Sequence, residues 1–180
     1  AEQRAFFLCL SPFSELTVPR MCALMGWAAL PGYAVEALSI PFIYYAPAES
    51  RYWPHQILLD FVVLKCRESG EAYEKACLAR AGDLCRAEGE TAQALSFYRR
   101  IRDYGRMLSL DFSHLLMESV SGAPFSQIAL DIARNCPEES MGRHPLSMLR
   151  IAWALLLSAH HAEFRALMKR LERLLDVCGG

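Results

Sequence analysis

Three histidines lie near the C-terminal end of the sequence, and histidine is the commonest metal ligand among the side chains. His160 and His161 are adjacent, and His144 precedes them by about the length of one helix. Adjacent residues on a helix project about 100° apart, so His160 and His161 do not face one ion together. No carboxylate completes a ligand set at this spacing, and we therefore expect no metal site.

Seven cysteines are the next candidates for chemistry, either as metal ligands or as disulfide partners. Their number is odd, they are widely scattered, and no two have the C-x-x-C spacing of a zinc or redox motif. Most lie among apolar neighbours, as small buried side chains in a reducing cytosol do. We expect free thiols and no disulfide framework. The seven are Cys9, Cys22, Cys66, Cys77, Cys85, Cys136 and Cys178.

Signatures of catalysis and of nucleic-acid binding are also weak. The sequence contains no G-x-x-x-x-G-K-[S/T] phosphate loop and no nucleophile on a strand-turn-helix signature, so we expect no catalytic residues and no enzyme in this chain. Asp103 lies within one arginine cluster and Asp111 follows it, which favours a solvated face with local ion pairs over a nucleic-acid contact. The cluster comprises Arg99, Arg100, Arg102 and Arg106.

The composition is that of a globular protein without a strong electrostatic field. Of 180 residues 53% are hydrophobic, and 19 Lys and Arg against 20 Asp and Glu give a net charge of −1, so we expect no binding to nucleic acid or membranes. The longest near-continuous apolar stretch is residues 148–159, which Arg150 interrupts and which fall short of the ~20 residues of a membrane span. No signal peptide opens the chain, so we expect a cytoplasmic protein. The sequence begins at Ala1 without a methionine and ends at Gly180 directly after a helical pattern, so we expect a piece of a longer protein.

The elements that position these residues are helical almost throughout, which predicts an all-α fold. Residues 1–68 predict a winged-helix-like domain, in which Thr17 caps the second helix and two aromatic-rich runs flank a Pro-containing polar turn. The predicted elements of this domain are helices over residues 3–10, 17–25, 32–38 and 55–67 and a β-hairpin over residues 41–53.

Residues 71–180 predict three antiparallel helical hairpins and no strand. The polar segment 135–144 is the longest insertion between these helices, and it is either a contact surface or a disordered loop. The six predicted helices cover residues 72–87, 91–101, 104–118, 125–135, 146–158 and 162–177.

Small residues recur in this region with a period of 35 residues, which predicts a tetratricopeptide-like helical solenoid. Such residues let two helices approach closely, so Gly82 and Ala94 are expected to face each other across the first hairpin. The alternative is an irregular helical bundle, because the second and third copies are degenerate. The matching positions are Ala94 with Ala129, Gly82 with Ala152, and Gly89 with Pro124 and Ala159.

Aromatic residues on such an array are candidates for ligand or partner contact. The concave face of a curved helical array collects side chains from successive hairpins into a groove that binds peptides, proteins or small ligands. Tyr104 and Trp153 are the residues that we expect to line it. The alternative is that both fill the interiors of their hairpins.

Residues 53–61, with the sequence Trp-Pro-His-Gln-Ile-Leu-Leu-Asp-Phe, join the predicted winged helix to the predicted repeats. This combination resembles the middle of signal-transduction ATPases that act as transcriptional regulators with a LuxR-type DNA-binding end, the class that includes the maltose-regulon activator. Residues 149–157, which contain Trp153, add to a resemblance that covers nearly the whole chain.

The resemblance implies a role for His55, which matches a histidine that reaches the phosphates of bound ADP and holds the off state. An imidazole at a helix start, beside free backbone N–H groups, is suited to meet an anion. Family members commonly have proline after this histidine, whereas here Pro54 precedes it and Gln56 follows. The alternative is that His55 caps its own helix or packs on Trp53.

The resemblance also implies a function for the chain as a whole. We expect a regulatory and sensor region that couples an inducer or partner protein on the helical repeats to a nucleotide-binding domain outside this chain. ATP or ADP is then a cofactor of the full-length protein only, and the remaining partners are its own nucleotide-binding and DNA-binding domains. The alternative is a stand-alone tetratricopeptide-like adaptor that binds a partner protein and has no nucleotide coupling.

Overall fold

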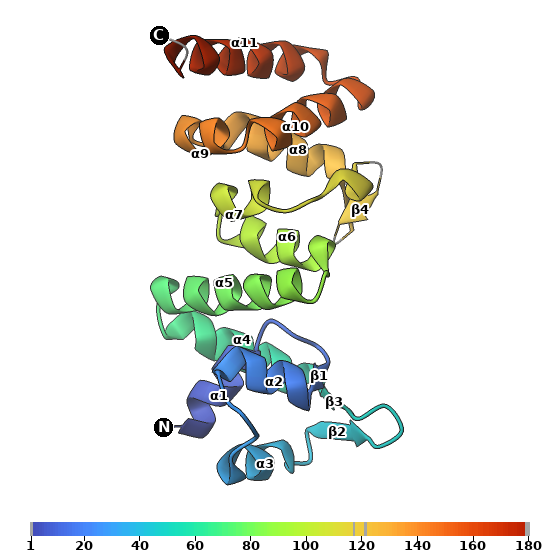
Figure 1. Cartoon of the computed structure of the whole chain (residues 1–180). Coiled ribbons are helices and arrows are strands. Elements are labelled where there is room, and N and C mark those ends of the chain that lie inside the picture. The colour runs from blue at the N-terminus through green and yellow to red at the C-terminus, as the bar shows by residue number, and fades with distance from the viewer. Residues whose placement is uncertain (1, 117, 121, 179–180) are drawn as a thin grey trace. The chain divides into compact units, whose positions relative to one another are not determined.

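The computed structural model describes residues 2–116, 118–120 and 122–178, and the chain divides into two compact units, Ala1–Leu84 and Cys85–Gly180. Helices account for most of the described residues (Figure 1), which confirms the predicted all-α class. The division between the two units falls inside the helix α5 (Glu71–Ala87). The predicted domain boundary, between residues 68 and 71, coincides instead with a turn at Gly70, where φ is +103°. The division into functional domains stays a prediction.

Unit 1, Ala1–Leu84, combines short helices with a three-stranded antiparallel sheet. The strand order is β1-β3-β2, so the first strand pairs with the last strand of the hairpin. The predicted helices and hairpin agree with the observed ones, but the sequence does not predict β1, because two residues carry no detectable alternation. In chain order the elements are α1 (Glu2–Leu10), β1 (Leu16–Thr17), α2 (Val18–Met25), α3 (Gly32–Leu38), β2 (Ile43–Ala46), β3 (Arg51–Pro54), α4 (Gln56–Glu68) and the first part of α5 (Glu71–Ala87).

The α2 helix begins and ends where its local sequence requires. The Thr17 side chain accepts a hydrogen bond from the backbone N–H of Arg20 at 3.3 Å, as an N-cap does, and Pro19 lies in the first turn. Gly26 ends the helix with φ +71°, a left-handed conformation that glycine adopts without a steric penalty. The predicted cap is therefore confirmed.

The core of unit 1 lies between α1 and the elements around it. The α1 helix packs against α2, α3 and α4, and Phe6, Phe13, Leu16 and Met21 are almost completely buried. Arg51 of β3 donates two hydrogen bonds to the Glu15 carboxylate, at 2.9 and 3.0 Å, beside the β1–β3 pair. These contacts hold the hairpin against the helices. The α4 helix begins directly after the last strand of that hairpin.

Unit 2, Cys85–Gly180, is built from antiparallel helices in which α10 packs against both α8 and α11. Its core residues include Phe112, Phe125, Ile128 and Ile151, all with 1% exposure or less. After the end of α5 the elements are α6 (Thr91–Arg100), α7 (Tyr104–Leu108), the 3₁₀ helix η1 (Ser113–Leu115), β4 (Ser119–Val120), β5 (Ala123–Pro124), α8 (Phe125–Asn135), α9 (Glu138–Arg143), α10 (Pro145–Leu157) and α11 (His161–Cys178).

The prediction of one helix over residues 104–118 is wrong, because α7 ends at Leu108. Beyond it, the Asp111 carboxylate accepts a hydrogen bond from the backbone N–H of Ser113 at 3.3 Å and holds the chain in a turn. Such side chains compete with helical hydrogen bonds for the backbone. A two-stranded sheet follows, β4 with β5, closed by Gly122 at φ +78°. The expectation that this half contains no strand is therefore also wrong.

The polar segment 135–144 is not a disordered loop, because six of its residues form α9. Pro137 precedes the helix in an extended conformation, Glu139 and Arg143 form an i,i+4 ion pair, and Met141 is fully buried. One buried methionine in a charged segment is too weak a pattern to distinguish a short helix from a loop.

Part of the 35-residue pattern coincides with equivalent structural positions. Ala94 and Ala129 are fully buried in their helices, as a close helix contact requires. Gly89 and Ala159, two periods apart, both have positive φ, +78° and +60°, in the turn before the next helix. Pro124, the middle member of that set, is extended instead, with φ −62°. The tetratricopeptide-like character of the array stays a prediction.

Candidate functional sites

His55 is an exposed residue at the start of α4, and it caps that helix. Its Nδ1 accepts a hydrogen bond from the backbone N–H of Ile57 at 3.2 Å. The His55 ring meets the Phe42 ring edge to face, with 6.5 Å between the ring centroids, rather than packing on the Trp53 ring. The capping alternative therefore describes this structure, while the phosphate contact stays a prediction. Capping uses Nδ1 and leaves Nε2 as the ring nitrogen for any further contact.

The outer side of α4 exposes three large apolar side chains at helical spacing. Ile57, Phe61 and Leu64 are 66%, 55% and 52% exposed, and the Lys65 ammonium lies over the Phe61 ring at 5.6 Å. We call these three residues the α4 face. A surface helix of a globular protein usually has one apolar side, which faces the core. The α4 face is a second apolar side, so unit 1 exposes a group of large apolar side chains next to His55.

A second exposed stripe lies on α10, and it contains Trp153. Its members follow one another at intervals of three or four residues, so they form one side of the helix. The opposite side is fully buried, and Arg150, at the margin, donates a hydrogen bond to the Asp111 carboxylate at 2.9 Å. We call the stripe the α10 face. It comprises Leu146, Leu149, Trp153 and Leu157, with exposures of 73%, 50%, 54% and 48%.

Tyr104, the other predicted groove residue, is buried in unit 2. Its hydroxyl donates a hydrogen bond to the Asp131 carboxylate of α8 at 3.5 Å, and its side chain is 8% exposed. Burial, followed by the nearby Asp131 charge, raises the pKa of the Tyr104 phenol. The structure thus separates the two predicted residues: Trp153 is accessible to a partner, whereas Tyr104 fills the interior and links α7 to α8.

The arginine cluster and the C-terminal histidines have ordinary surface environments. Arg106 donates a 2.9 Å hydrogen bond to Asp103 in the first turn of α7, and Arg99 lies 4.0 Å from Asp131. In the described ranges, the side chains close enough to share a metal ion belong to one group, which none of the histidines joins. That group is Cys85, Glu88 and Glu90, two of which are exposed acids.

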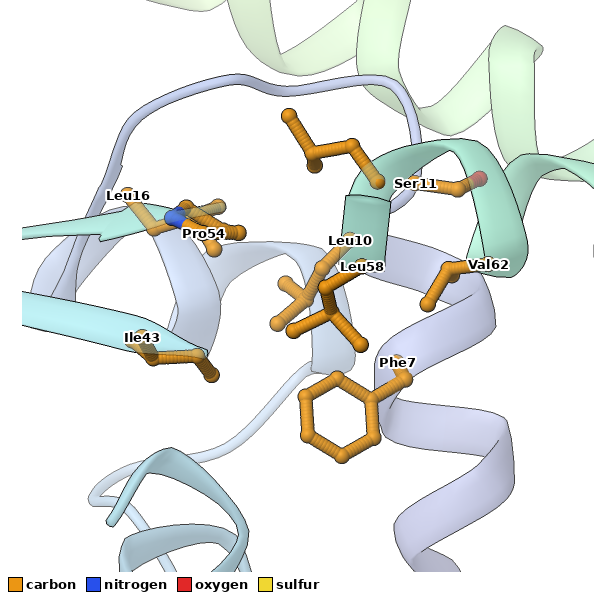
Figure 2. Close-up of a pocket in the computed structure, with 9 residues that line it drawn as sticks. Phe7, Leu10, Ser11, Leu16, Ile43, Pro54, Leu58 and Val62 are labelled. Atoms are coloured by element: carbon orange, nitrogen blue, oxygen red, sulfur yellow. The ribbon is translucent and has the colours of Figure 1, made fainter. Parts of the chain in front are cut away.

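A small, partly open cavity lies in unit 1, between α1, α4 and the sheet (Figure 2). Phe7, Leu10, Leu58 and Val62 point toward it from the two helices, and Ile43, the first residue of β2, also lines it. Its volume of about 10 Å³ is close to that of one water, and its walls are almost wholly apolar. This cavity is a small packing gap in the core and has no room for a ligand.

Three thiols that are distant in the sequence come together in the core of unit 1. Cys9 of α1, Cys66 of α4 and Cys77 of α5 belong to one buried cluster with Leu8 and Val62. The sequence does not predict this cluster, because residues of three separate helices have no common spacing. It could have been found only from a correct packing of α1 against α4 and α5.

Charged and polar groups surround the first of these thiols. Arg80 Nη2 lies 3.2 Å from Cys9 Sγ and 3.8 Å from Cys77 Sγ, and Tyr73 Oη lies 4.0 Å from Cys9 Sγ. A hydrogen bond from Cys77 lowers the pKa of Cys9, and Arg80 lowers it further against the effect of burial. The same hydrogen bond, together with burial, raises the pKa of Cys77. The pair therefore divides into a thiolate acceptor and a thiol donor.

No protein-family model, curated protein or solved structure matches this chain. Its relation to the signal-transduction ATPases therefore rests on the residues themselves and stays a prediction. Across residues 2–116, 118–120 and 122–178, no helix has the length and apolar character needed to span a bilayer.

Proposed function

We propose that this chain is the regulatory region of an ATP-dependent transcriptional regulator of the LuxR-type signal-transduction ATPases. Unit 1 contacts a nucleotide-binding domain that lies outside the chain, and unit 2 receives an inducer or a partner protein. The observation that carries this proposal is the element order of unit 1, α1-β1-α2-α3-β2-β3, with the sheet order β1-β3-β2. A winged-helix domain has the same order, in which a short first strand joins a later hairpin.

The surface chemistry of unit 1 supports a protein contact rather than a DNA contact. The α3 helix, which precedes the hairpin, contains Glu36 and no basic residue, so it cannot neutralise DNA phosphates. The α4 face presents large apolar side chains instead, and clusters of such side chains on a protein surface mark contact sites. A winged helix with these surfaces suits a regulatory contact between domains.

The α10 face supports the proposed role of unit 2. A tryptophan flanked by three exposed leucines is a typical anchor for an amphipathic partner helix, because Trp contributes a large apolar area at low entropic cost. Burying the α10 face would place a partner directly against α10, whose other side forms the core of the helical array. A partner bound there would therefore act on packed helices rather than on a loop.

The mechanism is a population shift between a closed state that retains ADP and an open state that assembles for transcription. In the closed state unit 1 lies against the nucleotide-binding domain, and His55 meets the phosphates. A signal bound to unit 2 favours the open state by its difference in affinity for the two states. A shift from 1:99 to 99:1 requires about 5.5 kcal/mol of differential binding.

The alternative function is a stand-alone tetratricopeptide-like adaptor. The α10 face favours it as well, because docking of a partner helix there requires no nucleotide-binding domain. The two functions differ in their dependence on His55, which an adaptor needs only as a helix cap.

Substitution of His55 in the full-length protein tests the proposal. His55→Asn keeps an N-cap side chain but removes the imidazole, whereas His55→Ala removes both. We expect both variants to release ADP faster and to raise basal transcription, with His114→Asn, at another exposed histidine, as the control. If His55→Asn retains ADP and basal activity like the unmodified protein, the contribution of His55 is confined to capping, and the regulatory proposal fails.

A further inference from the structure

We propose that Cys9 and Cys77 form a peroxide-sensitive thiol pair, which closes into a disulfide between α1 and α5 inside unit 1. The geometry that carries this inference is the shared contact with Arg80, whose Nη2 reaches both sulfur atoms, at 3.2 Å and 3.8 Å. One guanidinium nitrogen can touch both sulfurs only if they are close together. The proposal concerns unit 1 by itself and is independent of the proposed function.

The surroundings of Cys9 are those of a reactive thiol rather than an inert one. Reactive cysteines lie beside cationic groups, which stabilise the thiolate, while buried cysteines in apolar surroundings are inert. Arg80 supplies the cation, and the Tyr73 hydroxyl approaches the same sulfur at 4.0 Å. Cys136 is the contrasting case within the same chain, because burial raises its pKa to about 11.

The pair lies close enough to the surface for a small oxidant. Cys9 and Cys77 are 5% and 2% exposed, but Arg80, whose tip touches both sulfurs, is an exposed side chain. A surface groove also reaches Leu8 and Val62, which belong to the same cluster as Cys9. Hydrogen peroxide is only slightly larger than water, so it can approach a sulfur that lies directly beneath one side chain.

Hydrogen peroxide is the oxidant in two balanced steps. The Cys9 thiolate attacks one peroxide oxygen, the O–O bond breaks, and the leaving hydroxide takes up a proton, which gives Cys9 sulfenic acid and one water. The Cys77 sulfur then attacks Cys9 Sγ, the S–O bond breaks, and the hydroxyl leaves with the Cys77 proton as a second water. The two thiols lose two electrons, which reduce the peroxide. A dithiol reductant reverses the disulfide by exchange.

Formation of the sulfenic acid also prepares the second step. A hydrogen bond to Cys9 and the Cys9 charge both raise the pKa of Cys77 in the reduced pair. Oxidation of Cys9 removes that negative charge, so Cys77 becomes easier to deprotonate once its partner is oxidised. The order of events therefore assigns Cys9 as the attacking thiol and Cys77 as the resolving thiol.

Mass spectrometry of the 180-residue chain, treated with hydrogen peroxide at pH 7, tests the pair. We expect a loss of two hydrogen atoms in mass, a linked peptide that contains Cys9 and Cys77, and reversal by dithiothreitol. Cys77→Ser should instead accumulate a sulfenic acid on Cys9, trapped by dimedone, while Cys66→Ser should still form the disulfide. Arg80→Gln should slow the oxidation of Cys9 severalfold, with Arg86→Gln, on the same helix, as the matched control.

The rate of alkylation provides a second readout that does not depend on disulfide closure. At pH 7 iodoacetamide should modify Cys9 at least about tenfold faster than Cys136, since a tenfold difference in thiolate content corresponds to one pKa unit. Equal rates for Cys9 and Cys136, or a disulfide that joins Cys66 to either thiol instead, would overturn the proposal.

Discussion

Leu149 and Ile151 of α10 lie two positions apart, and their truncation tests whether the α10 face is accessible to a partner. Ile151 points into the core of unit 2 with no exposure, while Leu149 belongs to the α10 face and is half exposed. Each is truncated to alanine, so both variants lose a branched aliphatic side chain from the same helix. The comparison isolates the direction in which the side chain points.

The expected losses differ because burial differs. Truncation of a fully buried isoleucine costs about 2–5 kcal/mol, from the lost transfer free energy and the cavity that remains. Full burial of a leucine side chain is worth about 1.5–3 kcal/mol, so a half-exposed leucine loses about 0.75–1.5 kcal/mol, and the higher helix propensity of alanine offsets part of this. From the middle of the two ranges, we expect Ile151→Ala to destabilise the chain by about 2 kcal/mol more than Leu149→Ala.

Urea unfolding followed by far-ultraviolet circular dichroism measures the two free energies of unfolding. The chain has two compact units, so unfolding can occur in two steps. Replacing Trp27 and Trp53 leaves Trp153 as the one tryptophan, and the step in which its fluorescence intensity changes is then the unfolding of unit 2. Equal losses of stability for Ile151→Ala and Leu149→Ala would mean that Leu149 is packed within the chain and unavailable to a partner.

Three further predictions concern local features. His55→Ala should lower the free energy of unfolding by about 1 kcal/mol through loss of the α4 cap, while His55→Asn should leave it nearly unchanged, as urea unfolding can measure. Ala159→Gly should raise the thermal midpoint, because an alanine at φ +60° costs about 1 kcal/mol that glycine does not, and Gly89→Ala at φ +78° should lower it. Tyr104 has a raised pKa in the folded chain, so its contribution to the free energy of unfolding is complete below the pKa of an unfolded tyrosine and is lost as the pH rises through the folded pKa. Tyr104→Phe should therefore lose less stability than the unmodified chain between about pH 9 and 11, as urea unfolding can measure.

Much of unit 1 could be predicted from local sequence. Thr17, followed by Pro19, specifies the start of α2, and the aromatic runs on both sides of Pro47 specify the hairpin. The signals are local because caps and turns are fixed by a few adjacent residues. The β1 strand escapes such reasoning, since only its pairing with residues 51 and 52 defines it.

Unit 2 shows where local reasoning fails. The pattern of residues 104–118 is compatible with one helix, but the Asp111 side chain and the Gly122 turn redirect the chain after Leu108. Periodicity alone cannot weigh a side-chain hydrogen bond against a helical one.

The candidate sites were predictable to different degrees. Trp153 stands out by residue type, yet the α10 face becomes visible only when the buried side of the helix is known. Tyr104 has the same aromatic signal as Trp153 but lies in the interior beside Asp131. The thiol pair depends on the packing of α1 against α5, so no spacing in the sequence identifies it.

Transcription by the full-length protein, measured with and without inducer, tests whether units 1 and 2 have the proposed regulatory roles. We expect opposite effects from the two units: His55→Asn raises activity without inducer, and Trp153→Ser keeps that basal activity low but abolishes induction. Arg165→Ser, at an exposed position of α11, serves as the control and should behave like the unmodified protein. Normal basal activity in His55→Asn together with normal induction in Trp153→Ser would mean that neither unit has its proposed regulatory role.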